Sequence, residues 1–166
     1  MTNKTTVTAE PNKQELFIIR EFDAPRELVF KTFTNPELMA KWLGPKDMEV
    51  IFDYYEGGSG GKYRYYSVDA EGNQWGFHGV IHEVTAPERA IQTFEFEGLP
   101  ERGHVSLETA TFEVVDGNRT KVTIQSVFKS VADRDGIVMS GMEKGVTEGF
   151  EKMDEILASQ LQQGNS

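Results

Sequence analysis

Cysteine is absent from this chain of 166 residues, which excludes a disulfide framework and any chemistry that needs a thiolate. Long apolar runs are absent as well, and none approaches the ~20 residues that a membrane-spanning helix needs. Residues 1–14 are polar and lack the apolar segment of a signal peptide. We therefore expect a cytoplasmic protein without membrane insertion, and the chain length favours one domain with a substantial core.

Positive charge is scarce, because 17 Lys and Arg residues stand against 27 Asp and Glu residues, for a formal net charge of −10. An acidic domain repels phosphate backbones, so nucleic acid is not an expected partner. Histidine is scarce too. His78 and His82 share a face of one predicted strand and lie ~13 Å apart at the usual rise per residue. That separation is too large for one zinc ion, whose ligands lie within ~2.1 Å of it, and we expect neither a metal nor another cofactor.

One short pattern is similar to a catalytic motif. Residues 57–61 read Gly-Gly-Ser-Gly-Gly, which matches the G-x-S-x-G sequence of a hydrolase nucleophile elbow. The elbow requires a helix directly after the serine, whereas the residues that follow, 62–66, are typical of a strand. We interpret the segment as a glycine-rich hairpin loop and assign no catalytic residue.

Alternating apolar and polar positions predict an antiparallel sheet. Seven strands are expected, joined mostly by short turns rich in Asp, Asn, Gly and Pro. They cover residues 15–23, 48–54, 61–68, 74–85, 89–97, 105–115 and 120–129. Between the first two strands, Pro25 and Pro36 each stand at the start of a predicted short helix, where the missing N–H costs nothing.

Residues 131–161 carry apolar side chains at helical spacing and predict a long amphipathic helix, with a break near 135–136 left open. Its apolar stripe is expected to lie on the buried face of the sheet. The expected fold class is α+β, a curved antiparallel seven-stranded sheet around a long C-terminal helix, with two short helices after the first strand. The domain is expected at 15–161, with loose tails at 1–14 and 162–166.

Three glycines recur every four residues in the predicted long helix, at Gly141, Gly145 and Gly149. Each glycine inside a helix costs ~1 kcal/mol relative to alanine, so the row needs a structural reason. Two explanations stay open. The glycines allow close approach to bulky sheet residues, such as Trp75 and Phe77, or they leave room for a ligand.

A series of short motifs runs through residues 15–161. In chain order they are Arg20-Glu21-Phe22-Asp23-Ala24-Pro25, Val29-Phe30, Asn35-Pro36, Trp42-Leu43-Gly44-Pro45, Phe77-His78-Gly79, Ala86-Pro87-Glu88-Arg89, Thr93-Phe94-Glu95-Phe96, Ser106-Leu107-Glu108-Thr109, Arg134-Asp135 and Ser140-Gly141-Met142-Glu143-Lys144-Gly145. In this order they resemble the SRPBCC (START/helix-grip) superfamily, and within it the branch related to the C-terminal domain of the activator of the Hsp90 ATPase. The resemblance implies a helix-grip fold with a cavity between the sheet and the long helix.

The leading hypothesis is a protein that binds a small apolar or amphipathic molecule, similar to a lipid, sterol or polyketide, in that cavity. The expected lining residues are Trp42, Tyr63, Tyr65, Trp75, Phe77, Phe94, Phe112, Met139, Met142, Gly145 and Phe150. Three polar residues are candidates to orient a ligand, namely His78, His104 and Glu108. The alternatives are a protein-interaction or stress accessory domain, for which a chaperone partner stays open, and a cyclase or hydrolase that acts inside the cavity.

Overall fold

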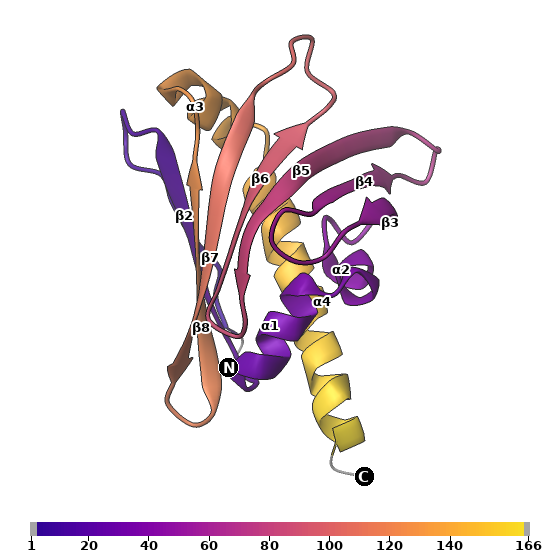
Figure 1. The fold of residues 1–166 in the computed structure, drawn as a ribbon, viewed down its shortest axis with the longest axis vertical. Coiled ribbons are helices and arrows are strands. Elements are labelled where there is room, and N and C mark those ends of the chain that lie inside the picture. The colour runs from indigo at the N-terminus through magenta and orange to yellow at the C-terminus, as the bar shows by residue number, and fades with distance from the viewer. Residues whose placement is uncertain (1–2, 165–166) are drawn as a thin grey trace.

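The computed structural model describes residues 3–164, which form one antiparallel sheet of eight strands and four helices (Figure 1). The strands are β1 (Thr6–Thr8), β2 (Glu15–Phe22), β3 (Glu49–Tyr55), β4 (Lys62–Val68), β5 (Gln74–Thr85), β6 (Arg89–Phe96), β7 (Val105–Val115) and β8 (Arg119–Val127). The helices are α1 (Arg26–Thr34), α2 (Pro36–Trp42), α3 (Val131–Met139) and α4 (Met142–Gly164). The predicted α+β architecture with a long C-terminal helix is confirmed.

The sheet has the strand order β1-β2-β8-β7-β6-β5-β4-β3 and curves around α1, α2 and α4, which lie on one side of it (Figure 1). Burial alternates along the strands for this reason. In β2, every second side chain from Leu16 to Phe22 is buried against the helices. The polar alternation that predicted the strands therefore marks which face of the sheet the helices cover.

The prediction of seven strands is wrong by one. The additional strand, β1, comes from the segment 1–14 that was expected to be a loose tail, and it pairs antiparallel with β2 at the sheet edge. Arg134 explains why this segment is held in place. Its buried guanidinium donates hydrogen bonds to the carbonyl oxygens of Glu10 (2.8 Å) and Glu15 (3.0 Å), on either side of the turn between β1 and β2.

The long C-terminal helix breaks at a different place from the one considered. Gly136 lies inside α3, and the break falls between Met139 and Met142. Gly141 adopts a positive φ of 84°, a conformation that glycine reaches without steric cost and that ends a helix. The break changes the rotation of the chain between α3 and α4. A single helical wheel drawn through both helices therefore puts the residues of α3 on the wrong face.

The short helices α1 and α2 bracket one end of the sheet. Asn35 begins α2 by accepting hydrogen bonds from two backbone N–H groups of its first turn, and Pro36 occupies the first helical position as predicted. Helices this short are not stable alone, so they depend on tertiary packing. Phe30 and Trp42 supply that packing, with only 5% and 6% of their surface exposed.

An ion pair between a buried arginine and a partly exposed aspartate joins α4 to the sheet. Arg20 on β2 shares the buried face of that strand, and its side chain is 1% exposed. Its guanidinium donates two parallel hydrogen bonds of 2.6 Å to the carboxylate of Asp154 on α4. A bidentate pair of this kind fixes orientation as well as contact, so it sets how α4 lies across the sheet.

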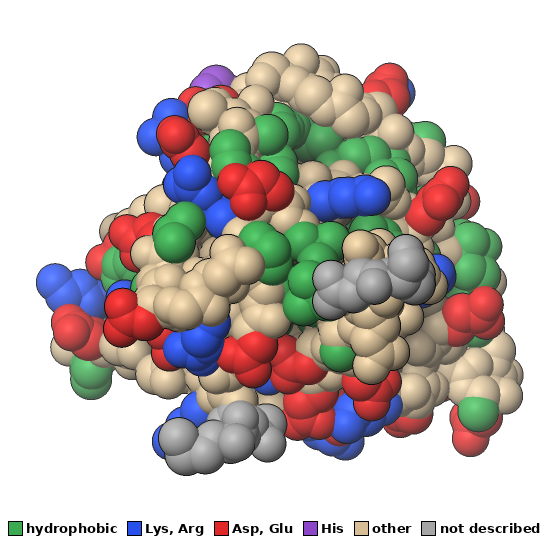
Figure 2. Space-filling model, turned by 90° about the horizontal axis from the view of Figure 1, so that it is seen from below, with side chains coloured by type: hydrophobic (Ala, Val, Ile, Leu, Met, Phe, Trp, Pro, Cys, Tyr) green, Lys and Arg blue, Asp and Glu red, His purple; other side chains and the backbone are tan. Residues whose placement is uncertain are grey.

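The surface is charged, in keeping with the net charge of −10. Figure 2 shows acidic and basic side chains interspersed over the face seen from below, with small groups of hydrophobic side chains between them. Within residues 3–164, no helix is long and apolar enough to cross a membrane.

Candidate functional site: an aromatic cavity under the long helix

A cavity of about 340 Å³ lies between the concave face of the sheet, the end of α2 and the first half of α4. This volume is at the lower end of the ~300–1,000 Å³ that is usual for small-molecule sites. Residues from β2 to β8 contribute to it, and Leu43 and Gly44 border it after α2. Its apolar side chains outside the aromatics include Ile18, Met39, Leu43, Ile81, Val84, Ala90, Ala110, Ile124, Met142 and Val146.

Nine of the residues that line the cavity are aromatic. They are Phe33, Trp42, Phe52, Tyr55, Tyr63, Tyr65, Phe94, Phe112 and Phe150. Many of them contact one another, in one group around Phe33 and a second group around Phe52. Phe33 packs against Trp42 at a centroid distance of 5.0 Å and against Phe112 at 5.2 Å, and Phe52 packs against Tyr65 at 5.2 Å.

Trp42 presents only its ring system to the cavity. Its indole N–H is turned away and donates a buried hydrogen bond of 2.8 Å to the carbonyl oxygen of Thr32 on α1. The one polar atom of this side chain is therefore hydrogen-bonded within the protein, which leaves an apolar surface for a ligand to contact.

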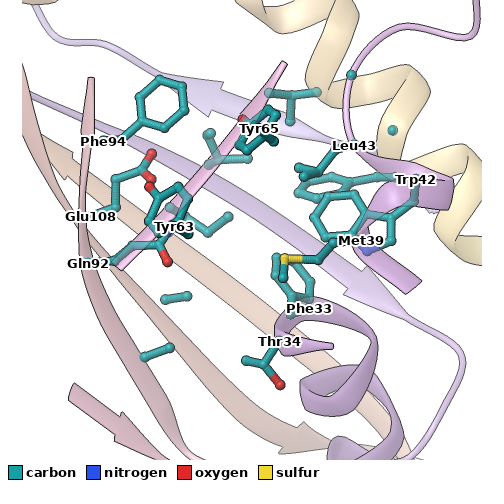
Figure 3. A pocket seen from close by; sticks show the side chains of 18 of the residues that line it. Phe33, Thr34, Met39, Trp42, Leu43, Tyr63, Tyr65, Gln92, Phe94 and Glu108 are labelled. Atoms are coloured by element: carbon teal, nitrogen blue, oxygen red, sulfur yellow. The ribbon is translucent and has the colours of Figure 1, made fainter. Parts of the chain in front are cut away.

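Polar atoms gather at the opposite wall, around Glu108 on β7 (Figure 3). Strand register places Gln92, Glu108 and Ser126 in a row across β6, β7 and β8. Both neighbours hydrogen-bond to the Glu108 carboxyl, and the Ser126 hydroxyl does so at 3.4 Å. Burial raises the pKa of Glu108, and these two hydrogen bonds act in the opposite direction. Glu108 is thus an acid held in a largely apolar enclosure.

Two tyrosines stand beside this acid. The Tyr63 hydroxyl donates a hydrogen bond of 2.6 Å to the carbonyl oxygen of Thr93 and crosses strand β5 at Gly79. A Cβ atom at Gly79 would lie 2.6 Å from that hydroxyl, so only glycine fits there. Burial, with a smaller contribution from Glu108, raises the pKa of Tyr63 and of Tyr65 far above the usual value. Both phenols stay neutral in the folded protein.

Most of the predicted lining residues do line the cavity. They are Trp42, Tyr63, Tyr65, Phe94, Glu108, Phe112, Met142, Gly145 and Phe150. Glu108 was one of three candidate orienting groups, and it is the one whose side chain the fold turns inward.

Five predicted residues lie outside the lining. His78 lies on the other face of the sheet, where its Nδ1 is 2.8 Å from a carboxylate oxygen of Glu97. His104 pairs with Asp133 at 3.0 Å near the start of α3. Met139 is 85% exposed because the helix breaks directly after it.

The other two misplaced residues, Trp75 and Phe77, are on β5 and are not part of the lining. Phe77 stacks on Tyr65 at 5.1 Å and on Phe94 at 5.4 Å, so it packs behind two lining residues without lining the cavity itself. Trp75 lies two residues before Phe77 on β5 and pairs with Ser67. The alternation that placed both on the concave face was right, but alternation does not show where along the strand the cavity ends.

The glycines of the long helix pack against a different part of the chain from the aromatic sheet residues that were expected. A Cβ atom at Gly149 would lie 2.8 Å from the carbonyl oxygen of Trp42, and one at Gly145 would lie 3.6 Å from the Pro45 ring. The close approach is therefore to the segment that follows α2, not to aromatic residues of the sheet. Both glycines also border the cavity, so the explanation that they leave room for a ligand stays a prediction.

Several lining residues were not predicted, among them Phe33, Met39, Phe52, Tyr55 and Gln92. Phe33 and Phe52 carried a usable signal, because each lies on the apolar face of its own predicted element. Gln92 carried none, since a polar residue in a strand reads as solvent-facing until its strand neighbour is known. Its pairing with Glu108 depends on the register between β6 and β7.

A curved antiparallel sheet that encloses a cavity with a long C-terminal helix defines a helix-grip protein. The family model for the activator of Hsp90 ATPase homolog 1-like proteins matches residues 23–158, and the chain belongs to this family of the SRPBCC superfamily. A search of curated proteins finds no match.

Solved structures share the fold over nearly the whole chain. A protein from Arthrobacter aurescens is 26% identical, with a TM-score of 0.83 over 93% of this chain and 91% of that one. A protein from Rhodobacter sphaeroides is 22% identical, with a TM-score of 0.84 over 94% and 99%. The AHSA1 protein from Silicibacter pomeroyi is 20% identical, with a TM-score of 0.73 over 88% and 99%.

Proposed function

We propose that this protein binds a small, largely apolar molecule in the cavity under α4. The cavity itself is the observation that supports the proposal. Protein interiors are close-packed, with few voids larger than a water molecule. A cavity of about 340 Å³ with many aromatic residues in its wall, between the sheet and the long helix, is space that a ligand can fill.

The test measures binding of a neutral fluorescent apolar dye, Nile red, to the wild type and to two variants. Ala110→Leu adds a large side chain to β7 at the cavity wall. Ala158→Leu makes the same change on the exposed face of α4, outside the cavity, and is the matched control. We expect saturable binding to the wild type and to the control, and binding at least several-fold weaker to Ala110→Leu at unchanged secondary structure.

A wild type that does not bind the dye, or an Ala110→Leu variant that binds it as the control does, would contradict the proposal. In that case an exposed docking surface for a protein becomes the better explanation of the fold. Native mass spectrometry of the protein purified from its own host provides the identity of the ligand, because a retained molecule adds its own mass to that of the chain.

A second candidate function, acid–base catalysis inside the cavity, has one observation in its favour. Such an enzyme needs an inward-facing titratable group with a shifted pKa, and burial raises the pKa of Glu108. The ligand found by mass spectrometry can be incubated with the wild type and with Glu108→Gln. A product formed by the wild type alone would support catalysis, and an unchanged ligand in both samples would oppose it.

A further inference from the structure

In the part of the chain that the structure describes, the cavity wall has one carboxyl group and no basic group. Glu108 is the one carboxyl group in the lining, and no Lys, Arg or His lines the cavity within residues 3–164. A carboxylate ligand, such as a fatty acid, would enter without a cation to pair with and would face a second carboxyl group. Removing a charge from water without a partner is costly, so the wall disfavours anionic ligands.

The Glu108 carboxyl has hydrogen-bonding capacity that the protein leaves open. An ionised carboxylate has about four acceptor positions on its two oxygens. Gln92 and Ser126 are the groups that hydrogen-bond to it, and the Ser126 contact is long, at 3.4 Å. Glu108 lines the cavity, where Figure 3 shows it on the wall between Gln92 and Phe94, so a ligand in the cavity can reach this carboxyl.

The surroundings of this carboxyl suit a cation. Tyr63 and Tyr65 are close enough to Glu108 for its charge to affect their ionisation, and Phe94 completes the wall beside them. The faces of aromatic rings attract cations within ~6 Å of the ring centroid. A protonated amine at this place would meet a carboxylate as hydrogen-bond acceptor and aromatic rings as additional electrostatic support.

We propose that the ligand is an amphiphile with a protonated amine, whose ammonium group pairs with Glu108 while its apolar body fills the aromatic part of the cavity. This inference rests on the proposed function and adds the chemical class of the ligand. The apolar end would lie toward Trp42 and Phe33, where the wall exposes no free polar atom of Trp42. The ligand is small, since the cavity is at the lower end of the usual range of volumes.

The test compares three molecules with the same chain and different head groups: n-octylamine, 1-octanol and octanoate. Each is titrated by calorimetry into the wild type, Glu108→Gln and Glu113→Gln at neutral pH. Glu113 is on the same strand as Glu108 and exposed to solvent, so Glu113→Gln removes an equal charge outside the cavity. It therefore controls for attraction of amines to the acidic surface.

We expect the wild type and Glu113→Gln to bind octylamine about tenfold or more tightly than octanol, as for a hydrogen bond to a charged group, and octanoate most weakly. Glu108→Gln keeps the shape and should bind the amine and the alcohol within a few-fold of each other. Amine binding to the wild type should also release protons, because an ammonium group favours the ionised form of Glu108. Calorimetry in buffers of different ionisation enthalpy detects this release.

The outcomes separate the two proposals. If octanol binds the wild type as tightly as octylamine, or if Glu108→Gln keeps the amine preference, the cavity still binds apolar molecules but the inference about the amine is wrong. If octanoate binds most tightly, the inference is also wrong. If the wild type binds none of the three molecules and no Nile red, the proposed function itself fails.

Discussion

Two glycines of α4, Gly145 and Gly149, lie against the segment around the end of α2, and we expect substitutions at them to have different effects. At Gly149 an added Cβ would lie 2.8 Å from the carbonyl oxygen of Trp42, which is backbone and cannot turn aside. At Gly145 an added Cβ would lie 3.6 Å from Pro45, an ordinary van der Waals distance. The variants Gly149→Ala and Gly145→Ala therefore differ in one respect, the space around the new methyl group.

The magnitudes follow from two opposing effects. Alanine gains ~1 kcal/mol of helix propensity over glycine at either position. At Gly145 nothing opposes this gain, so the variant should be more stable than the wild type by about 0.5–1 kcal/mol. At Gly149 forcing a methyl group into a closed contact costs ~1–3 kcal/mol, which equals or exceeds the gain. Gly149→Ala should thus be less stable than Gly145→Ala by about 1–3 kcal/mol.

Urea denaturation followed by tryptophan fluorescence measures both free energies of unfolding by linear extrapolation. For a domain of this size, each kcal/mol corresponds to roughly 2–4 °C in melting temperature, so thermal melts provide a second measurement. If Gly149→Ala is as stable as Gly145→Ala, the close contact with Trp42 does not constrain the helix, and the reasoning is refuted. Gly145→Leu extends the test, since Gly145 borders the cavity. We expect that variant to fold and to lose affinity for Nile red.

Three further predictions concern the core and the cavity. Trp42→Ala should lower the free energy of unfolding by about 3–5 kcal/mol, because Trp42 is 6% exposed; a denaturation midpoint equal to that of the wild type would contradict its placement. Asp154→Asn should cost about 2–4 kcal/mol, somewhat below the ~3–5 of a fully buried pair because Asp154 is 34% exposed. The control Glu151→Gln, in an exposed pair with Lys46, should change the free energy of unfolding much less, and equal losses in the two variants would argue against a special role for Arg20. For Glu108, burial raises the pKa above its usual 4.5, so the folded state keeps a proton that the unfolded state releases. Stability should therefore fall as pH rises from 4.5 through the raised pKa. Because Glu108→Gln cannot ionise, thermal melts should show it as stable as the wild type in acid and more stable at neutral pH. An equal pH dependence of both proteins would show that Glu108 is not the group responsible.

Local pattern was enough to predict most of the fold. Alternation along β2 to β8 and the turn residues between them depend only on near neighbours in the chain, and so do the capping of α2 by Asn35 and the amphipathic stripe of α4. The three-residue strand β1 was missed because its stability comes from pairing with β2 and from Arg134, more than a hundred residues away. The break at Gly141 was misplaced because two glycines in this region read alike until their φ angles are known.

The sequence by itself determined most of the elements of this protein, the covered face of its sheet and its family, because each depends on periodicity or on the order of short motifs. Tertiary structure alone decided which residues meet around the cavity. Strand register placed Gln92 and Ser126 beside Glu108, and the path of the chain after α2 placed Trp42 against Gly149. Such contacts join residues far apart in the chain, so their chemistry, including the burial that raises the pKa of Glu108, exists only in the folded state.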